Sequence, residues 1–264
     1  MTSVHDFMAA APARLDGSSP WARRYAAELR RVVNETANNS ARTLQRHLGP
    51  SELGVECDRQ VAGKFAGVPT TNHVVDPWPS VVGTAVHAWL AEAFTADNAR
   101  HGLRWLAEQR VVPHPDHAGT ADLYDAVEQA VVDHKILGES SMAKVRSPKG
   151  PPRKYRVQLK LYGLGYIKLG LPVRRVALAA YPRTSHTLDG LYVWEEESGP
   201  QDEALFTEVF HQTVQRRQYG DQLSSGRISL TDIPSAPDDD ECYFCPFYRP
   251  QSAKDGGPGC PGPR

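Results

Sequence analysis

The chain has 264 residues, of which 40% are hydrophobic and 23% are charged, and its formal net charge is -1. These values are typical of an ordinary soluble globular protein with one large domain or two small ones. A net charge this close to zero excludes bulk charge as a source of attraction to nucleic acid, so any such binding requires a local basic cluster. No apolar run approaches the length of a membrane span, and residues 1–19 lack the apolar stretch of a secretory signal. We therefore expect a cytoplasmic protein with no membrane partner.

The first part of the chain is predicted to be helical after a flexible tail. Residues 1–19 are rich in Ala, Pro and Ser, which is typical of a mobile terminus. From residue 20 to about residue 48, apolar residues recur at helical spacing and predict an amphipathic helix. A Gly-Pro step at residues 49–50 breaks this pattern. Ser51 is then expected to cap a second helix that carries Cys57.

The middle of the chain is predicted to alternate between strands and helices around one core. A third helix is expected to begin at Ser80. Mixed strands flanked by helices make an α/β layer, here in the order αβββαβ followed by a helix and a Pro/Gly/Asp-rich tail. The later elements are expected at residues 105–112, 119–125 and 129–137 (strands), a helix through 157–167, strands at 174–181 and 191–195, and a helix at 202–223.

Two aspartates and a lysine are expected to meet on neighbouring strands. Side chains two residues apart share a strand face, so Asp133 and Lys135 point one way and His134 points the other way. Asp122, in the preceding strand, lies across the predicted hairpin. Close carboxylates repel each other unless a cation lies between them, and oxygen-rich sites suit Mg²⁺ or Mn²⁺. Asp-x-Lys is common on exposed strands, so its weight depends on the motifs around it.

Further motifs surround this pair in a definite order. His87 closes a G-x-x-x-H motif on the helix before the strands, and Asp122 closes a G-x-x-D motif. Gln158 and Tyr162 are spaced i, i+4 and therefore share one helix face. Taken singly, these residues read as a surface histidine and a polar helix rim. Taken together, the order is G-x-x-x-H, G-x-x-D, D-x-K and Q-x-x-x-Y.

This order resembles the RecB-like branch of the PD-(D/E)XK nucleases. It is especially similar to the four-cysteine exonucleases associated with CRISPR systems and to their relatives encoded by bacteriophages, over residues 51–260. The resemblance implies a restriction-endonuclease-like α/β core with a helical N-terminal lobe and a four-cysteine iron–sulfur staple. It also implies one nuclease domain over residues 20–264, with a core at about 80–225 and a cluster lobe at about 50–66 and 236–264.

The resemblance also assigns roles to individual residues. Lys135 is expected to position and activate the attacking water, and Gln158 and Tyr162 to contact the phosphate or the strand end near the cut. The implied ligands of a Mg²⁺ or Mn²⁺ ion are His87, Asp122, Asp133 and the backbone carbonyl of His134.

Three acidic positions need separate comment. Glu108 matches an acidic position present in some relatives and is expected to support the site. Asp125 lies too close to the hairpin turn to be assigned to the metal. Asp133 stands where many relatives have glutamate, and its shorter side chain could shift the metal preference.

A run of basic residues separates the D-x-K strand from the Q-x-x-x-Y helix. A solvated loop is the plain interpretation of such a run. At the rim of a nuclease site we expect it instead to bind DNA phosphates, with an affinity that falls as salt rises. The prolines and glycine at 148–152 predict an extended segment that orders on DNA. The basic residues are Lys144, Arg146, Lys149, Arg153, Lys154 and Arg156.

Four cysteines lie near the two ends of the chain. Cys242 and Cys245 have metal-chelating spacing, and four thiolates can hold zinc or a [4Fe–4S] cluster. The resemblance favours the cluster, with Cys57 as the lone upstream ligand. Zinc and free or disulfide-linked thiols are the alternatives, although a chain without an export signal is a poor candidate for disulfides. Cys260 follows an unusually long gap and is the least secure ligand.

The function expected from these features is metal-dependent hydrolysis of DNA by an exonuclease that acts on single strands or exposed ends. The resemblance suggests 5′-to-3′ polarity and a role in recombination, repair or phage DNA processing, with a helicase or recombination partner for unwinding. One alternative is a CRISPR adaptation nuclease that trims spacers together with an integrase. Others are a non-catalytic DNA-binding module with a structural metal site, and a zinc-ribbon adaptor.

Overall fold

The computed structural model describes residues 19–39, 48–72, 76–236 and 239–262. The chain divides into two compact units. The sheet unit consists of residues 46–69 and 82–236, and the tail unit consists of residues 1–45, 70–81 and 237–264. The single nuclease domain expected over residues 20–264 stays a prediction. No helix in the described part of the chain combines the length and the apolar character needed to span a bilayer.

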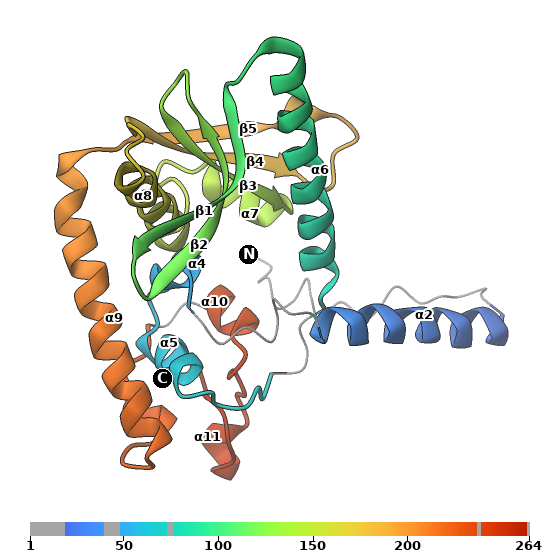
Figure 1. Ribbon diagram of the computed structural model, residues 1–264. Coiled ribbons are helices and arrows are strands. Elements are labelled where there is room, and N and C mark those ends of the chain that lie inside the picture. The colour runs from blue at the N-terminus through green and yellow to red at the C-terminus, as the bar shows by residue number, and fades with distance from the viewer. Residues whose placement is uncertain (1–18, 40–47, 73–75, 237–238, 263–264) are drawn as a thin grey trace. The chain divides into compact units, whose positions relative to one another are not determined.

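The sheet unit is built on one five-stranded mixed sheet in the order β1-β2-β3-β4-β5 (Figure 1). The pairs β1–β2, β2–β3 and β4–β5 are antiparallel, and β3–β4 is parallel. The fold is therefore mixed α/β, as the sequence predicts. The strands are β1 (Trp105–His114), β2 (His117–Asp125), β3 (Ala130–Leu137), β4 (Arg175–Pro182) and β5 (Tyr192–Glu197).

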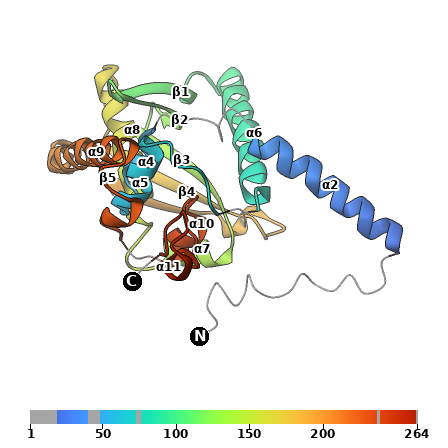
Figure 2. The same cartoon turned by 90° about the horizontal axis from the view of Figure 1, so that it is seen from below.

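Helices cover the sheet on both faces. Both views place α6 and α8 on opposite sides of the strands (Figures 1 and 2). The first four residues of α6 belong to the tail unit. The helices of the sheet unit are α4 (Pro50–Leu53), α5 (Asp58–Phe65), α6 (Trp78–His101), α7 (Glu139–Val145), α8 (Arg153–Lys168) and α9 (Glu203–Ser224), with short 3₁₀ helices η1 (Leu188–Gly190), η2 (Pro200–Asp202) and η3 (Leu230–Asp232).

The central helix α8 is buried between two apolar clusters. On one side Leu159 and Tyr166 pack in the cluster that includes the sheet residues. On the other side Leu161 packs with residues from α4, α5 and α9. A helix that is apolar on most of its circumference belongs in a core. A Cβ on Gly165 would lie 2.7 Å from Cβ of Val111, so this glycine allows α8 to approach β1 closely. The close approach sets how near the polar side chains of α8 lie to the sheet.

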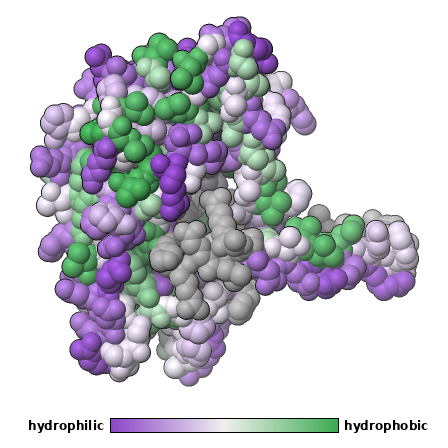
Figure 3. Space-filling model, viewed as in Figure 1, coloured by the Kyte–Doolittle hydropathy of each residue, from purple (hydrophilic) through white to green (hydrophobic). Residues whose placement is uncertain are grey.

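The tail unit contains α2 (Pro20–Asn38), α10 (Asp239–Phe244) and α11 (Ser252–Asp255). None of the residues of α2 is buried. Its larger apolar side chains, Trp21, Tyr25, Leu29 and Val32, are all exposed. Figure 3 shows hydrophobic residues on one face of this helix and hydrophilic residues on the other, which is the amphipathic pattern expected from the sequence.

The elements differ from the sequence prediction at several boundaries. The first helix ends at Asn38 and not near residue 48, and residues 40–47 lie outside the described residues. The predicted second helix is two helices, because Gly54 ends α4. Cys57 is the N-cap of α5 and does not lie within a helix. The sequence did not predict α7, a seven-residue helix without a clear apolar period, which occupies part of the basic run.

Candidate active site

The D-x-K motif lies on β3 with its two charged side chains directed at α8. Asp133 is 1% exposed. Its Oδ2 lies 2.6 Å from Nζ of Lys135, and its Oδ1 accepts a hydrogen bond of 2.9 Å from Nε2 of Gln158. The ring of His134 points to the other face of the sheet, where it stacks on Phe94 with centroids 5.6 Å apart. The alternation of side chains along a strand produces this separation.

Asp122 meets the D-x-K motif from the neighbouring strand. Leu123 pairs with Val132 at the end of the β2–β3 ladder, so the register sets Asp122 opposite Asp133. Oδ2 of Asp122 accepts a hydrogen bond of 2.8 Å from the backbone N–H of His134. The carboxylate therefore ties β2 to β3 just beyond the last paired residues, while its other oxygen remains available to other partners.

His87 and Glu108 approach Asp122 from two further elements. Nδ1 of His87, on α6, lies 3.4 Å from Oδ1 of Asp122. Glu108 is opposite Asp122 on β1, because the flanking pairs join Ala107 to Leu123 and Gln109 to Ala121. Each of the three residues offers one ligand atom, and these atoms lie within 4.8 Å of one another.

The backbone of Glu108 is in a conformation that is rare for a residue with a side chain. Its φ is 51°, in the left-handed region, although it lies inside a strand. Non-glycine residues in this region cost on the order of 1 to 3 kcal/mol and cluster at functional sites. The sequence assigned Glu108 only a supporting role. In the structure its carboxylate lies beside His87 and Asp122, so we regard it as a candidate ligand.

Burial and charge move the pKa values of the two aspartates in opposite directions. Burial raises the pKa of Asp133 to about 6, against the lowering effect of the Lys135 ammonium group. Burial would also raise the pKa of Asp122, but the hydrogen bond and charge of His87 outweigh it and the pKa is lowered. Burial likewise opposes the charge of Lys135, yet the nearby Asp133 and Asp122 carboxylates raise the pKa of Lys135. The site therefore combines a lysine whose charged form is favoured with an aspartate that holds its proton more tightly than usual, because the pKa values of both groups are raised.

The Q-x-x-x-Y motif lies on α8 and contacts the D-x-K motif. Besides its bond to Asp133, Gln158 accepts a hydrogen bond of 3.4 Å from Nζ of Lys135 and donates one of 3.4 Å to the hydroxyl of Tyr162. Burial raises the pKa of Tyr162 to about 12, which keeps this phenol neutral as a hydrogen-bond donor. The contact with phosphate expected from the sequence stays a prediction.

The donor set fits a divalent cation of the kind the sequence implies. Oδ2 of Asp133 is buried and, among the described residues, receives no hydrogen bond of normal geometry despite its closeness to Lys135. A separate group consists of the His87 imidazole and the Glu108 and Asp122 carboxylates, whose ligand atoms lie within 4.8 Å of one another. Hard oxygen donors with one nitrogen suit Mg²⁺ or Mn²⁺. A contribution from the backbone carbonyl of His134 stays a prediction.

Several residues around the site have structural partners of their own. Asp125 forms an ion pair with Arg104 at 2.6 Å and accepts hydrogen bonds from the turn amides of Val127 and Glu128. Sequence reasoning missed Tyr155, whose ring centroid lies 5.2 Å from Nζ of Lys135. Its position one turn before Gln158 on the same helix was the available signal.

The six basic residues are not one extended segment. Lys144 lies in α7, whereas Arg153, Lys154 and Arg156 lie in the first turn of α8. Arg153 is 2.8 Å from Glu208, and Arg156 is 3.0 Å from Glu196. The side chain of Arg153 is part-buried and that of Arg156 is exposed. Because each is paired with a glutamate, each would have to exchange that carboxylate for a phosphate in order to bind DNA. Residues 148–152, which were predicted to be extended, form turns and bends between the two helices, and their ordering on DNA stays a prediction.

The three C-terminal cysteines lie in one compact unit. The backbone N–H of Cys245 donates to the carbonyl of Cys242 at 3.0 Å, and Cys260 exchanges backbone hydrogen bonds with Phe247 and Arg249 at 2.6 and 2.7 Å. These bonds close the long loop between Cys245 and Cys260, and the four cysteines form no disulfide. Cys57 belongs to the other unit. The four-cysteine iron–sulfur or zinc site therefore stays a prediction.

A short upstream segment contacts the C-terminal cysteine segment, which sequence reasoning did not predict. Nδ2 of Asn72 donates to the carbonyls of Tyr243 at 2.8 Å and Cys245 at 3.0 Å. The hydroxyl of Thr71 donates to the carbonyl of Phe247 at 3.0 Å. These side chains satisfy backbone groups around the Cys-x-x-Cys turn and hold it in shape within the tail unit.

Comparison with known proteins gives only distant similarities. No protein-family model matches the sequence, and no curated protein matches it. An alkaline exonuclease from Laribacter hongkongensis is similar with a TM-score of 0.46 and 10% identity, over 69% of this chain and 95% of that one. A phage-related exonuclease from Haemophilus somnus 129PT is similar with a TM-score of 0.39 and 15% identity, over 69% of this chain and 96% of that one. Both of these proteins are exonucleases.

Proposed function

We propose that the protein is a divalent-metal-dependent deoxyribonuclease that hydrolyses phosphodiester bonds. The observation that supports this most directly is the convergence of Asp122 and Asp133 with the ammonium group of Lys135, beside His87 and Glu108. Perturbed titratable groups gathered from several elements are typical of catalytic sites. The residues that would hold the ion are His87, Glu108, Asp122 and Asp133.

Lys135, Gln158 and Tyr162 would each have a different role in the proposed hydrolysis. A bound divalent ion would supply charge neutralisation at the phosphate and a more acidic water. Lys135 would hold the attacking water and the developing negative charge by hydrogen bonding. Gln158 fixes the orientation of both Asp133 and Lys135, because its amide contacts each of them. Tyr162, kept neutral by burial, would donate a hydrogen bond to a non-bridging phosphate oxygen.

We propose DNA strands with free ends as the substrate and a stepwise exonuclease action. The motif order supports this, and the basic residues at the amino end of α8 would attract the DNA backbone. Preference for single strands, 5′-to-3′ polarity, and recombination or helicase partners are part of this proposal, as are a cytoplasmic location and a role in recombination, repair or phage DNA processing. An iron–sulfur cluster held by the cysteines would be structural and not redox-active in this reaction, since hydrolysis requires no electron transfer.

The test is an assay on labelled linear DNA with the purified full-length chain. We expect progressive shortening of single strands in Mn²⁺ or Mg²⁺ at pH 8, complete loss of activity with excess EDTA, and recovery when Mn²⁺ is restored. Circular single-stranded DNA should resist, because an exonuclease needs an end. Cutting of the circle would contradict the exonuclease assignment, and failure to cut any DNA with either ion would contradict the nuclease itself.

The raised pKa of Asp133 predicts how metal binding depends on pH. A carboxylate must lose its proton to bind a cation, so Mn²⁺ affinity should fall by roughly tenfold per pH unit below about pH 6 and level off above pH 7. His87, whose pKa is raised mainly by its hydrogen bond to Asp122, should add to the fall. Calorimetric titrations at pH 5, 6, 7 and 8 measure this. A His87→Gln variant should keep the share of the pH dependence that is due to Asp133. A wild-type Mn²⁺ affinity that is unchanged from pH 5 to pH 7 would contradict the ligand role of Asp133.

A further inference from the structure

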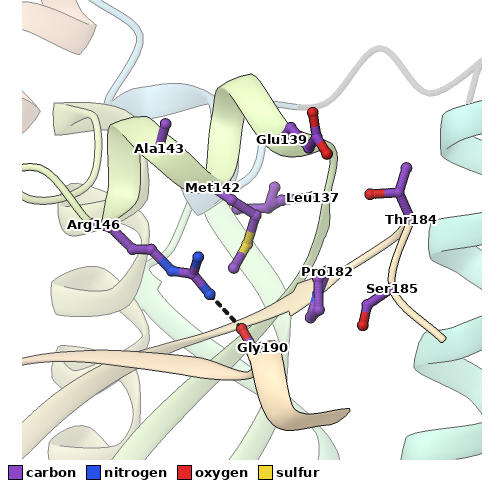
Figure 4. A pocket seen from close by; sticks show the side chains of 9 residues that line it. All are labelled: Leu137, Glu139, Met142, Ala143, Arg146, Pro182, Thr184, Ser185 and Gly190. Atoms are coloured by element: carbon purple, nitrogen blue, oxygen red, sulfur yellow. Dashed lines mark hydrogen bonds between the residues drawn. The ribbon is translucent and has the colours of Figure 1, made fainter. Parts of the chain in front are cut away.

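A cavity lies at the carboxyl ends of the two parallel strands, next to the candidate active site along β3. Its volume is about 420 Å³. Leu137 at the end of β3, Pro182 at the end of β4 and Met142 of α7 form its apolar wall. Figure 4 shows these side chains between α7 and the segment that follows β4. The proposed chemistry gives this cavity no role, although one of its lining residues, Arg146, belongs to the basic run.

The register of β3 connects the cavity to the D-x-K motif. Asp133, Lys135 and Leu137 are each two residues apart on one strand, so their side chains share a face. At about 3.3 Å per residue, Leu137 lies roughly 7 Å along the strand from Lys135. A strand of DNA whose phosphate contacts Lys135 would therefore bring a neighbouring nucleotide to the cavity.

The polar residues at the rim suit a nucleobase better than a phosphate. Arg146 donates a hydrogen bond of 2.6 Å to the carbonyl of Gly190, and a guanidinium group has five N–H donors, so this bond does not use all of them. Glu139 offers an accepting carboxylate and Thr184 a hydroxyl at the same cavity (Figure 4). The negative charge of Glu139 disfavours a phosphate. A base has an apolar face together with donors and acceptors on its edge, and this wall and rim can match both.

We propose that this cavity binds the base of the nucleotide next to the scissile phosphate, which rests on the proposed nuclease function. The apolar wall would stack on the base, while Arg146, Glu139 and Thr184 would contact its edge. A base reaches such a cavity only when it is unstacked and unpaired. The cavity therefore selects single strands or frayed ends over intact duplex, independently of the catalytic residues.

The test combines a modified substrate with a variant that fills the cavity. A single abasic residue is placed in turn at each position near the end of a labelled single strand, and kcat/KM is measured with the wild-type chain. We expect one position at which the missing base lowers kcat/KM by about tenfold or more, because stacking of one base contributes on the order of 1 to 3 kcal/mol. In Ala143→Trp, which fills the cavity from α7, the intact strand should be cut more slowly and the abasic penalty should disappear. Ser140→Trp, which adds the same bulk on α7 outside the cavity, should behave like the wild type.

The failure of this inference differs from failure of the proposed function. If the wild type cuts DNA but tolerates an abasic residue at every position, the cavity does not bind a base although the nuclease function stands. If Ala143→Trp keeps the full abasic penalty, the base binds elsewhere. If the wild type cuts nothing, the nuclease proposal fails. Fluorescence anisotropy with Ca²⁺ in place of Mn²⁺ then tests the cavity alone, and equal affinity of the wild type and Ala143→Trp for a single strand would overturn it.

Discussion

Replacing Asp133 with asparagine is expected to reduce DNA hydrolysis in Mn²⁺ at least about a thousandfold, which corresponds to roughly 4 kcal/mol of lost transition-state stabilisation. The neutral amide is a poor ligand for a divalent ion. Asp133 lies opposite Asp122 and accepts a hydrogen bond from Gln158, so we expect it to join the proposed ion to the D-x-K motif. Single-turnover assays on a labelled single strand, with Mn²⁺ binding by calorimetry, measure the effect.

Asp116→Asn provides the matched control for this variant. Asp116 lies in the turn between β1 and β2, and its side chain is 63% exposed, so the same chemical change there should leave activity unaltered. Thermal unfolding of both variants shows whether the fold is kept. An Asp133→Asn protein that folds, binds Mn²⁺ as the wild type does and retains more than a tenth of the activity would exclude Asp133 as a ligand.

The second large effect is expected from Lys135→Met. The rate of hydrolysis should fall by about 10² to 10³, since this is the usual loss when a charged or hydrogen-bonding group that stabilises a transition state is removed. Methionine keeps much of the apolar volume without the charge. Mn²⁺ binding should persist, because the carboxylates remain. Without its ion pair at 2.6 Å, the pKa of Asp133 should rise further, so the residual activity should depend on higher pH than that of the wild type.

The measurement for Lys135→Met is therefore a full rate profile from pH 6 to pH 9 at a fixed Mn²⁺ concentration below saturation, where protons compete with the metal for Asp133. Lys254→Met, an exposed position on α11, is the control for losing one positive charge. A residual rate that peaks at the same pH as the wild type would mean that Lys135 and Asp133 are not electrostatically linked. A rate within threefold of the wild type would remove Lys135 from the mechanism.

The sequence predicted the strands and the longer helices because their patterns are periodic and local. β1 to β5 were all expected within a few residues of their observed bounds, since each is a short apolar or alternating run between turn residues. The short elements were not predictable in this way. α7 has seven residues and no repeated apolar spacing, and the break between α4 and α5 depends on Gly54 packing against α8, which is a long-range contact.

The candidate site shows the same division between local and long-range information. Strand alternation was enough to place Asp133 and Lys135 together, and helical spacing was enough for Gln158 and Tyr162. The placement of His87 and Glu108 at the site was expected only from the family resemblance, because it depends on the register of β1 against β2 and on where α6 lies across the sheet. The ion pairs of Arg153 and Arg156 could not be predicted from the sequence either, because their glutamate partners are far away along the chain.

The left-handed backbone at Glu108 bears on any effort to engineer this protein for heat resistance. Glycine adopts φ near 51° without steric penalty, so Glu108→Gly would relieve local strain while removing a carboxylate from the cluster with His87 and Asp122. A selection based on thermostability alone would favour that exchange, whereas a selection that also requires metal-dependent turnover would reject it. At this position, thermal stability would favour glycine, whereas catalytic turnover would favour glutamate.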